Sequence, residues 1–219
     1  MFSQTEENYL KCIYLQLEKN AQSLVTTSVI SEQMKTTAAS VTDMLKRLSG
    51  KKLIHYKKYQ GVLLTKSGRI KALSIVRKHR LWEYFLVEKL KFQWDEIHAV
   101  AEQLEHVASE LLIDKLDVFL GRPKFDPHGD PIPDHHGKLS LHRLKNLSLL
   151  KPREKGKVAA VVEQDPDFLK HLERLQIQIE TPIKVLDKAE FDRSMTISIN
   201  GSGTVNISYD IAKNILIGK

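Results

Sequence analysis

Apolar residues recur at helical spacing through the first 50 positions of the chain and then alternate over a short stretch that contains a glycine. A repeat of three or four residues predicts amphipathic helices over residues 5–17, 27–34 and 38–50. Residues 53–57 and 62–65 predict two strands, because a tight turn that includes Gly61 separates them. Three helices followed by a hairpin are typical of a winged helix-turn-helix.

The pattern stays helical over residues 66–90, 97–109 and 111–120, and a tract rich in Gly and Pro then runs to residue 134. From Lys157 apolar and polar positions alternate, which predicts a small β-barrel of the SH3-like kind. We therefore expect a mainly α protein with a small β domain. The expected parts are a winged helix-turn-helix (1–65), a second helical domain (66–137), a linker (138–156) and an SH3-like barrel (157–219).

Residues 97–109 carry the strongest chemical signal. On a single helix His98, Glu102, Glu105 and His106 stand at i, i+4, i+7 and i+8, so all four side chains share one face. Upstream, His79 and Glu83 repeat the i, i+4 spacing on the long helix. Imidazoles and carboxylates are costly to bury unless they are paired or bound to a metal. The spacing therefore predicts a divalent metal site between two packed helices.

Charge is distributed unevenly along the chain. Residues 1–80 carry a net charge of +10, residues 81–150 carry −4, and residues 151–219 carry +1. A basic first third indicates a nucleic-acid-binding head on a different second module. Small residues at the start of the third helix would let it approach base edges in the major groove, and lysines of the wing would reach phosphates. The candidate DNA-binding residues are Thr27, Thr37, Ala38, Ala39, Ser40, Thr42, Asp43, Lys46, Arg47, Lys57 and Lys58.

Cysteine content and the N-terminal sequence narrow the class further. The single Cys12 excludes an intramolecular disulfide and a thiolate-rich zinc site. No signal peptide is evident, and no apolar run approaches the ~20 residues of a membrane span. We expect a cytoplasmic protein without a membrane partner. Trp82, Trp94 and Phe119 are available for a homodimer interface.

Several stretches together resemble the diphtheria toxin repressor family of metal-dependent transcriptional regulators, and also its manganese-sensing branch. They are residues 7–10, residues 77–83, His98 with residues 102–106, and residues 130–133. The resemblance covers essentially the whole chain, and it implies that residues 66–137 form a metal-binding and dimerisation domain and residues 157–219 a FeoA-like domain. It implies a repressor, not an enzyme, that binds about two Mn²⁺ or Fe²⁺ ions per chain and then binds a double-stranded DNA operator as a homodimer to control metal-homeostasis genes.

The resemblance also implies two ligand sets. One comprises His79, Glu83 and His98, with Glu163 or Gln164 and Asp167 of the barrel as further ligands. The other comprises Glu102, Glu105, His106 and a residue near the N-terminus, where Asn8 stands in place of the Met or Asp of the relatives. Lys11 occupies a position that is Glu in one manganese branch, and Glu102 one that is Cys in the iron branch. A set of O and N ligands without thiolate favours Mn²⁺ and also accepts Fe²⁺.

Two other classes remain open from the residues. A winged-helix regulator switched by a non-metal effector or by oxidation of Cys12 has the same DNA-binding head. A zinc hydrolase of the inverted type needs His-x-x-Glu-His, and Glu102 stands where its first histidine would be.

Overall fold

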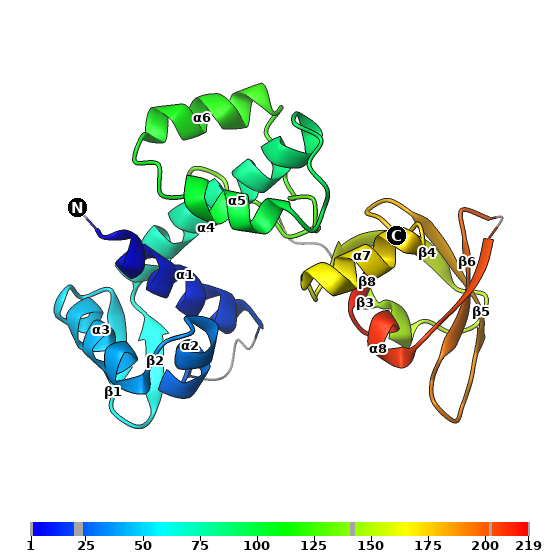
Figure 1. Cartoon of the computed structure of the whole chain (residues 1–219), viewed down its shortest axis with the longest axis horizontal. Coiled ribbons are helices and arrows are strands. Elements are labelled where there is room, and N and C mark those ends of the chain that lie inside the picture. The colour runs from blue at the N-terminus through cyan, green and yellow to red at the C-terminus, as the bar shows by residue number, and fades with distance from the viewer. Residues whose placement is uncertain (1, 20–23, 141–142, 202, 219) are drawn as a thin grey trace. The chain divides into compact units, whose positions relative to one another are not determined.

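The computed structural model describes residues 2–19, 24–140, 143–201 and 203–218, which form two compact units. One unit comprises residues 1–79, 102–115 and 133–138, and the other comprises residues 80–101, 116–132 and 139–219. The division falls inside the long helix α4 (Lys66–Glu88), which contributes to both units. Figure 1 shows the elements of the whole chain.

The first unit contains the winged helix. Helices α1 (Gln4–Lys19), α2 (Thr27–Gln33) and α3 (Ala38–Gly50) precede strands β1 (Ile54–Lys57) and β2 (Gly61–Leu64), which pair antiparallel. Thr26 and Thr37 cap the second and third helices through their hydroxyl oxygens. The buried apolar side chains that join these elements include Leu10, Ile13, Ile30, Leu45 and Leu48.

Gly61 illustrates how closely this unit packs. Val25 forms an isolated bridge with Val62, so a third short segment joins the hairpin. A Cβ on Gly61 would lie 2.8 Å from the carbonyl oxygen of Val25, and its φ of +123° is a conformation that L side chains rarely adopt. The glycine of the predicted turn is therefore required by both space and backbone.

Helix α5 (Ile97–Leu104) is shorter than the periodicity predicts. Residues 105 and 106 form a turn, and α6 (Glu110–Phe119) follows. The prediction of one helix over residues 97–109 is wrong, because the chain turns where the buried side chain of Glu105 bonds to Lys11 and His79. One helix face cannot therefore carry all four candidate ligands.

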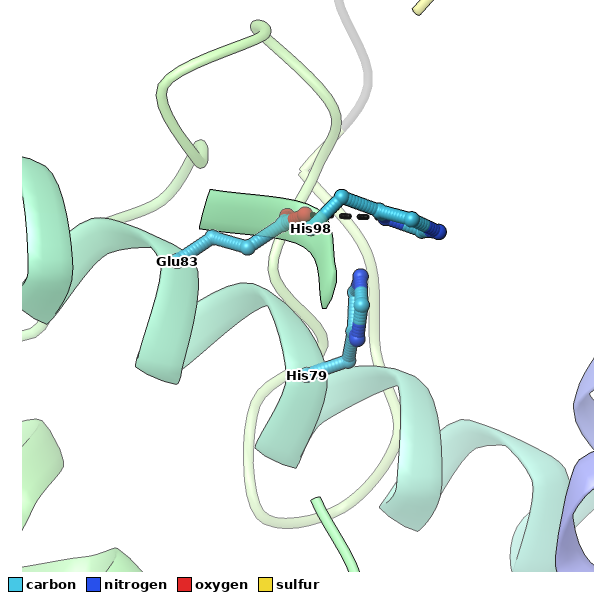
Figure 2. A group of neighbouring side chains, drawn as sticks. All are labelled: His79, Glu83 and His98. Atoms are coloured by element: carbon cyan, nitrogen blue, oxygen red, sulfur yellow. Dashed lines mark hydrogen bonds and ion pairs between the residues drawn. The ribbon is translucent and has the colours of Figure 1, made fainter. Parts of the chain in front are cut away.

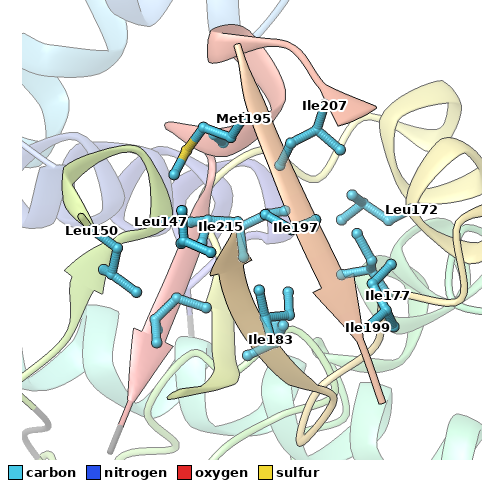
Figure 3. Close-up of a cluster of buried hydrophobic side chains, with 14 of the residues drawn as sticks. Leu147, Leu150, Leu172, Ile177, Ile183, Met195, Ile197, Ile199, Ile207 and Ile215 are labelled. Carbon is cyan, nitrogen blue, oxygen red and sulfur yellow. The ribbon is translucent and has the colours of Figure 1, made fainter. Parts of the chain in front are cut away.

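The second unit contains a six-stranded antiparallel sheet with the order β3-β8-β4-β5-β6-β7. Its strands are β3 (Lys145–Asn146), β4 (Lys155–Val161), β5 (Pro182–Lys188), β6 (Met195–Ile199), β7 (Gly203–Ile207) and β8 (Ile215–Gly218). A 3-10 turn, η1 (Leu147–Leu149), and helices α7 (Pro166–Arg174) and α8 (Tyr209–Ala212) complete it. Figure 3 shows the apolar side chains that fill its interior. The predicted SH3-like domain is confirmed by this sheet.

The segment predicted as a linker, residues 138–156, is in large part structured. Leu147 and Leu150 are buried in the core of the sheet domain, and β3 pairs with β8. The apolar positions around these two leucines are few and irregularly spaced, so the local pattern did not predict a strand or a buried segment here. Residues 141–142 of this segment lie outside the described residues.

Candidate metal centre

His79 and Glu83 stand one turn apart on α4, where their side chains are buried. His98, on α5, places its Nδ1 3.3 Å from Oε1 of Glu83. Figure 2 shows these three side chains converging, and one ligand atom from each lies within 4.8 Å of the others. The side chain of His98 is 54% exposed, so this group opens to solvent. The structure thus brings together the first ligand set expected from the sequence.

A second group, which the sequence reasoning missed, shares Glu83. Ligand atoms of Glu83, Asp126 and His128 lie within 4.8 Å of one another, and all three residues are buried. The sequence signal was present as Asp126-Pro127-His128, but it lies in a tract that was interpreted only as a loop. Its proximity to Glu83 depends on how that loop folds back.

Packing against β4 holds the loop in place. The backbone N–H of Val161 donates to the carbonyl oxygen of His128 (2.9 Å). Gly129 lies so close to this strand that a Cβ would be 2.0 Å from the carbonyl oxygen of Ala159. The ring of His128 stacks on Trp94, with centroids 5.6 Å apart. Trp94, which was predicted to be available for a dimer interface, is half-buried and donates its indole N–H to the carbonyl oxygen of Pro127 in this loop.

His128 is the least satisfied polar side chain of this group. It is 1% exposed, and both of its ring nitrogens are buried without a hydrogen-bond partner among the described residues. Burial lowers the pKa of His128, which favours the neutral form that binds metals. Buried imidazole nitrogens are costly when unpaired, so a ligand role fits this residue.

Asp126 is fixed by its own loop. Its Oδ1 accepts the backbone N–H groups of His128 (2.8 Å) and Asp130 (2.9 Å), and its Oδ2 lies 3.6 Å from Nε of Arg80. Burial, followed by the charges of Asp130 and Glu83, raises the pKa of Asp126 well above its usual value. A cation at this place would favour the ionised carboxylate.

The second predicted ligand set is only partly assembled. Glu105 is 1% exposed, and its Oε2 accepts hydrogen bonds from Lys11 Nζ (2.7 Å) and from His79 Nδ1 (2.6 Å). Glu102 is exposed and its Oε1 lies 3.6 Å from Nζ of Lys11. Among the described residues, Glu102, Glu105 and His106 do not form a compact group like the two above.

Unpaired buried atoms nevertheless mark a ligand position in this region. Oδ1 of Asn8 and Oε1 of Glu105 have no hydrogen-bond partner among the described residues. His106 donates Nδ1–H to Oε2 of Glu7 (2.8 Å), because a carboxylate accepts, and its Nε2 lies 3.8 Å from Oε1 of Glu105. An imidazole whose one nitrogen donates to a carboxylate, which leaves the other nitrogen to bind the ion, is a common arrangement for a metal ligand. Asn8, Glu105 and His106 therefore fit a divalent cation.

Burial and pairing act in opposite directions on Glu105. Burial raises the pKa of this carboxyl, but the hydrogen bond from His79 and the charge of Lys11 outweigh burial and hold the pKa below its usual value. Because a carboxylate accepts, Nδ1 of His79 carries the proton of this hydrogen bond, so a neutral His79 would use Nε2 to bind a metal ion. Glu105 therefore belongs to one predicted set and orients a histidine of the other.

Two of the barrel residues predicted as ligands, Glu163 and Asp167, belong to neither compact group. Glu163 and Asp167 are exposed, and Oε1 of Glu163 accepts the backbone N–H groups of residues 164 and 165. Gln164 reaches furthest inward, since its Nε2 donates to Oδ2 of Asp130 (3.0 Å). Asp130 in turn lies 3.5 Å from Arg80. The barrel thus contacts the loop that carries Asp126 and His128 through the side chain of Gln164.

The predicted DNA-binding residues lie on the surface of the winged helix. Ala38, Ala39 and Ser40 form the exposed first turn of α3, and Lys57 and Lys58 are exposed in the wing. The remaining candidates, Thr27, Thr37, Thr42, Asp43, Lys46 and Arg47, are exposed or half-buried. Thr42 directs its hydroxyl to the carbonyl of Ala38, and Lys46 pairs with Asp43 on the same helix. The backbone of α3 can therefore approach a groove without displacing bulky side chains.

Comparisons with known proteins agree with this architecture. Residues 1–62 match the model of the iron dependent repressor N-terminal DNA binding domain. Residues 65–134 match that of the metal binding and dimerisation domain, and residues 145–219 match the FeoA domain. A manganese-dependent transcriptional repressor in complex with manganese is 32% identical, with 98% of this chain and 99% of that chain covered and a TM-score of 0.87.

The chain belongs to the iron-dependent repressor family. Another solved relative, ScaR with bound Zn²⁺, is 33% identical over 98% of this chain and 99% of its own, with a TM-score of 0.76. The iron-dependent repressor IdeR of Mycobacterium leprae is 34% identical over 129 residues, or 59% of this chain and 55% of that protein. The chain thus spans about half the length of the curated relatives it matches. In the described part of the chain no helix is both long and apolar enough to cross a bilayer.

Proposed function

We propose that this iron-dependent repressor family member is a transcriptional repressor whose DNA binding is activated by Mn²⁺ or Fe²⁺. One observation carries the proposal: both ring nitrogens of His128 are buried without a hydrogen-bond partner among the described residues, beside the buried carboxylates of Glu83 and Asp126, in a chain that also carries a winged helix. Such unpaired atoms are costly in an apo protein unless a ligand satisfies them. The family consists of transcriptional repressors, which are not an enzyme class.

Two ions per chain fit the donor atoms. Asn8, Glu102, Glu105 and His106 would hold one, and Glu83 with His79, His98, Asp126 and His128 would supply the ligands of the other. Glu163, Gln164 and Asp167 lie outside this proposed inner set. All of these donors are oxygen or nitrogen, a set that suits Mn²⁺ and Fe²⁺ and contains no soft thiolate.

A bound divalent cation supplies the positive charge that lets these carboxylates approach one another. The chain's own residues balance the remaining charge and orient the ligands. Lys11 balances Glu105 from the N-terminal helix, and Glu7 orients the ring of His106. Since α1 packs with α2 and β2 of the winged helix, a change in these contacts reaches the DNA-binding elements. If the metal ion binds the DNA-competent state a few kcal/mol more tightly than the other state, the fraction of operator bound changes strongly.

Selection of DNA from a random double-stranded pool tests this function. We expect enrichment of one operator sequence in MnCl₂ and loss of retention when EDTA replaces the metal. Equal retention in both conditions would contradict the metal switch and would favour a non-metal effector. The amount of operator bound at fixed salt is the measurement, because phosphate contacts make affinity strongly salt-dependent.

Ala39→Glu on α3 is expected to weaken operator binding by about 1–3 kcal/mol, since it places a carboxylate at the base edges in the major groove. Fluorescence anisotropy with labelled operator in MnCl₂ gives the dissociation constant. Ala189→Glu, at an exposed position between β5 and β6, is the matched control and should leave the constant unchanged. A similar loss in both variants would assign the effect to net charge alone.

We also propose that the chain acts as a homodimer that buries α6. This helix exposes Leu111 (70%), Val118 (58%) and Phe119 (65%), and it lies within the region matched by the dimerisation domain. Exposed apolar side chains gathered on one helix favour contact with another protein surface. Two winged helices held by such a dimer would meet half-sites about 34–36 Å apart.

Phe119→Lys is expected to shift the chain from dimer to monomer in sedimentation velocity, with a cost of about 2 kcal/mol or more to association. Phe191→Lys is the control, because Phe191 is a fully exposed aromatic residue between β5 and β6. If Phe191→Lys dissociated the dimer and Phe119→Lys did not, the interface would lie on the barrel.

A further inference from the structure

Three consecutive residues of the first helical turns of α1 have three different environments. Glu6 contacts the end of α3, and Glu7 accepts the hydrogen bond of His106. Asn8 directs its buried Oδ1 to no hydrogen-bond partner among the described residues. Because successive residues of a helix point about 100° apart, this short segment contacts the recognition helix and the candidate metal centre at once.

Both carboxylate oxygens of Glu6 are used. Oε2 accepts the backbone N–H of Ser3 (3.1 Å), and the N–H of Glu6 donates to the hydroxyl oxygen of Ser3 (3.2 Å). This reciprocal pair is a capping box that closes the first turn of α1. Oε1 accepts from Nζ of Lys51 (2.6 Å) and lies 3.3 Å from Nε of Arg47. One side chain therefore fixes the start of α1 and the end of α3.

The carboxylate of Glu6 is buried, so its charge must be compensated by nearby groups. Glu6 is 1% exposed, whereas the side chains of Arg47 and Lys51 are 59% and 40% exposed. A buried carboxylate is tolerated only while charged or polar partners compensate it. If these ion pairs break, the side chains of Arg47 and Lys51 can be solvated by water, but the buried carboxylate of Glu6 cannot. The end of α3 is therefore held next to α1, because the buried carboxylate of Glu6 needs Arg47 and Lys51 to compensate its charge.

We propose that Glu6 is a positioning residue that couples the Asn8–Glu105–His106 centre to recognition helix α3. The inference rests on the proposed metal-dependent function and names a path for it. When Asn8 and His106 are fixed, Glu7 and the first turn of α1 are fixed with them. Glu6 in the same turn then holds Arg47 and Lys51, and through them the helix that enters the groove.

Hydrogen–deuterium exchange of the full chain, metal-free and in MnCl₂, tests this coupling without DNA. In the wild type, Mn²⁺ should slow exchange roughly fivefold or more both at residues 104–108 and at residues 44–51 of α3. In Glu6→Gln, the slowing at residues 104–108 should persist, while that at residues 44–51 should fall below about twofold. Glu18→Gln, on the same helix at its other end, should behave as the wild type does, since Glu18 accepts the Tyr14 hydroxyl.

Lys51→Met removes the other side of the contact and keeps the test valid if Glu6→Gln unfolds. It should reproduce the selective loss at α3. Retention of wild-type slowing at residues 44–51 in both variants would overturn the inference alone. Loss at residues 104–108 as well would make Glu6 part of the metal centre and would also overturn it. A wild type that shows no slowing at residues 104–108 would instead refute the proposed metal centre itself.

Discussion

Glu83→Gln is expected to reduce the Mn²⁺ bound per chain from about two ions to about one. Glu83 belongs to both compact ligand groups, with His79 and His98 in one and with Asp126 and His128 in the other. An amide offers a weaker, neutral oxygen, so the loss of affinity should exceed the roughly 10–100-fold typical of outer-shell substitutions. Anaerobic equilibrium dialysis measures the stoichiometry.

Thermal unfolding gives an independent readout for the same variant. A ligand at 100 times its dissociation constant stabilises a fold by about 2.7 kcal/mol, so losing one of two sites removes about that contribution at this concentration. Glu88→Gln, five residues along the same helix and exposed, is the matched control and should keep both ions. Two ions bound to Glu83→Gln would show that neither group is a metal site as assigned.

Glu105→Gln is expected to have the largest effect on the metal-free chain. The carboxylate compensates the buried ammonium of Lys11 and accepts a hydrogen bond from His79. Removing one member of a buried charge pair costs about 3–5 kcal/mol, because the remaining charge is left uncompensated. Urea unfolding in EDTA measures this loss. The same variant should also lose the ion assigned to Asn8, Glu105 and His106.

Acid adds a second signature. The pKa of Glu105 is lowered in the folded chain, so its contribution to stability is present above the unfolded value of 4.5 and is lost as the pH falls through the folded value. The unfolding free energy of the wild type should therefore decline more steeply than that of Glu105→Gln as the pH drops below 4.5. Glu96→Gln, in an exposed position before α5, should follow the wild type in every measurement. Equal stability of Glu105→Gln and wild type would contradict the pairing with Lys11.

Local patterns explain why much of the fold was predictable. Hydrophobic spacing located α1 to α4, and the winged hairpin follows from a glycine between two apolar runs. In the barrel, residues 195–199 alternate cleanly and predict a strand, and β6 (Met195–Ile199) has these bounds. Strand β8 (Ile215–Gly218) was not predicted, because its three apolar residues follow one another directly and do not alternate with polar ones.

The candidate site divides in the same way. Helical spacing by itself determined that His79 and Glu83 share a face, because i and i+4 lie together on any α-helix. The basic first third and the small residues of α3 likewise follow from the sequence alone. Sequence could not place His128 or Asp126 beside Glu83, since that depends on a loop held against β4.

The pairing of carboxylates with histidines depends on the tertiary structure. The turn after Leu104 sends Glu105 to His79 and Lys11 and sends His106 to Glu7, whereas a continuous helix would have kept them with His98. These contacts join residues up to 99 positions apart. Periodicity reports which side of one element is apolar, but pairing of buried charges depends on which other elements pack there and on the cost of leaving any of them unpaired.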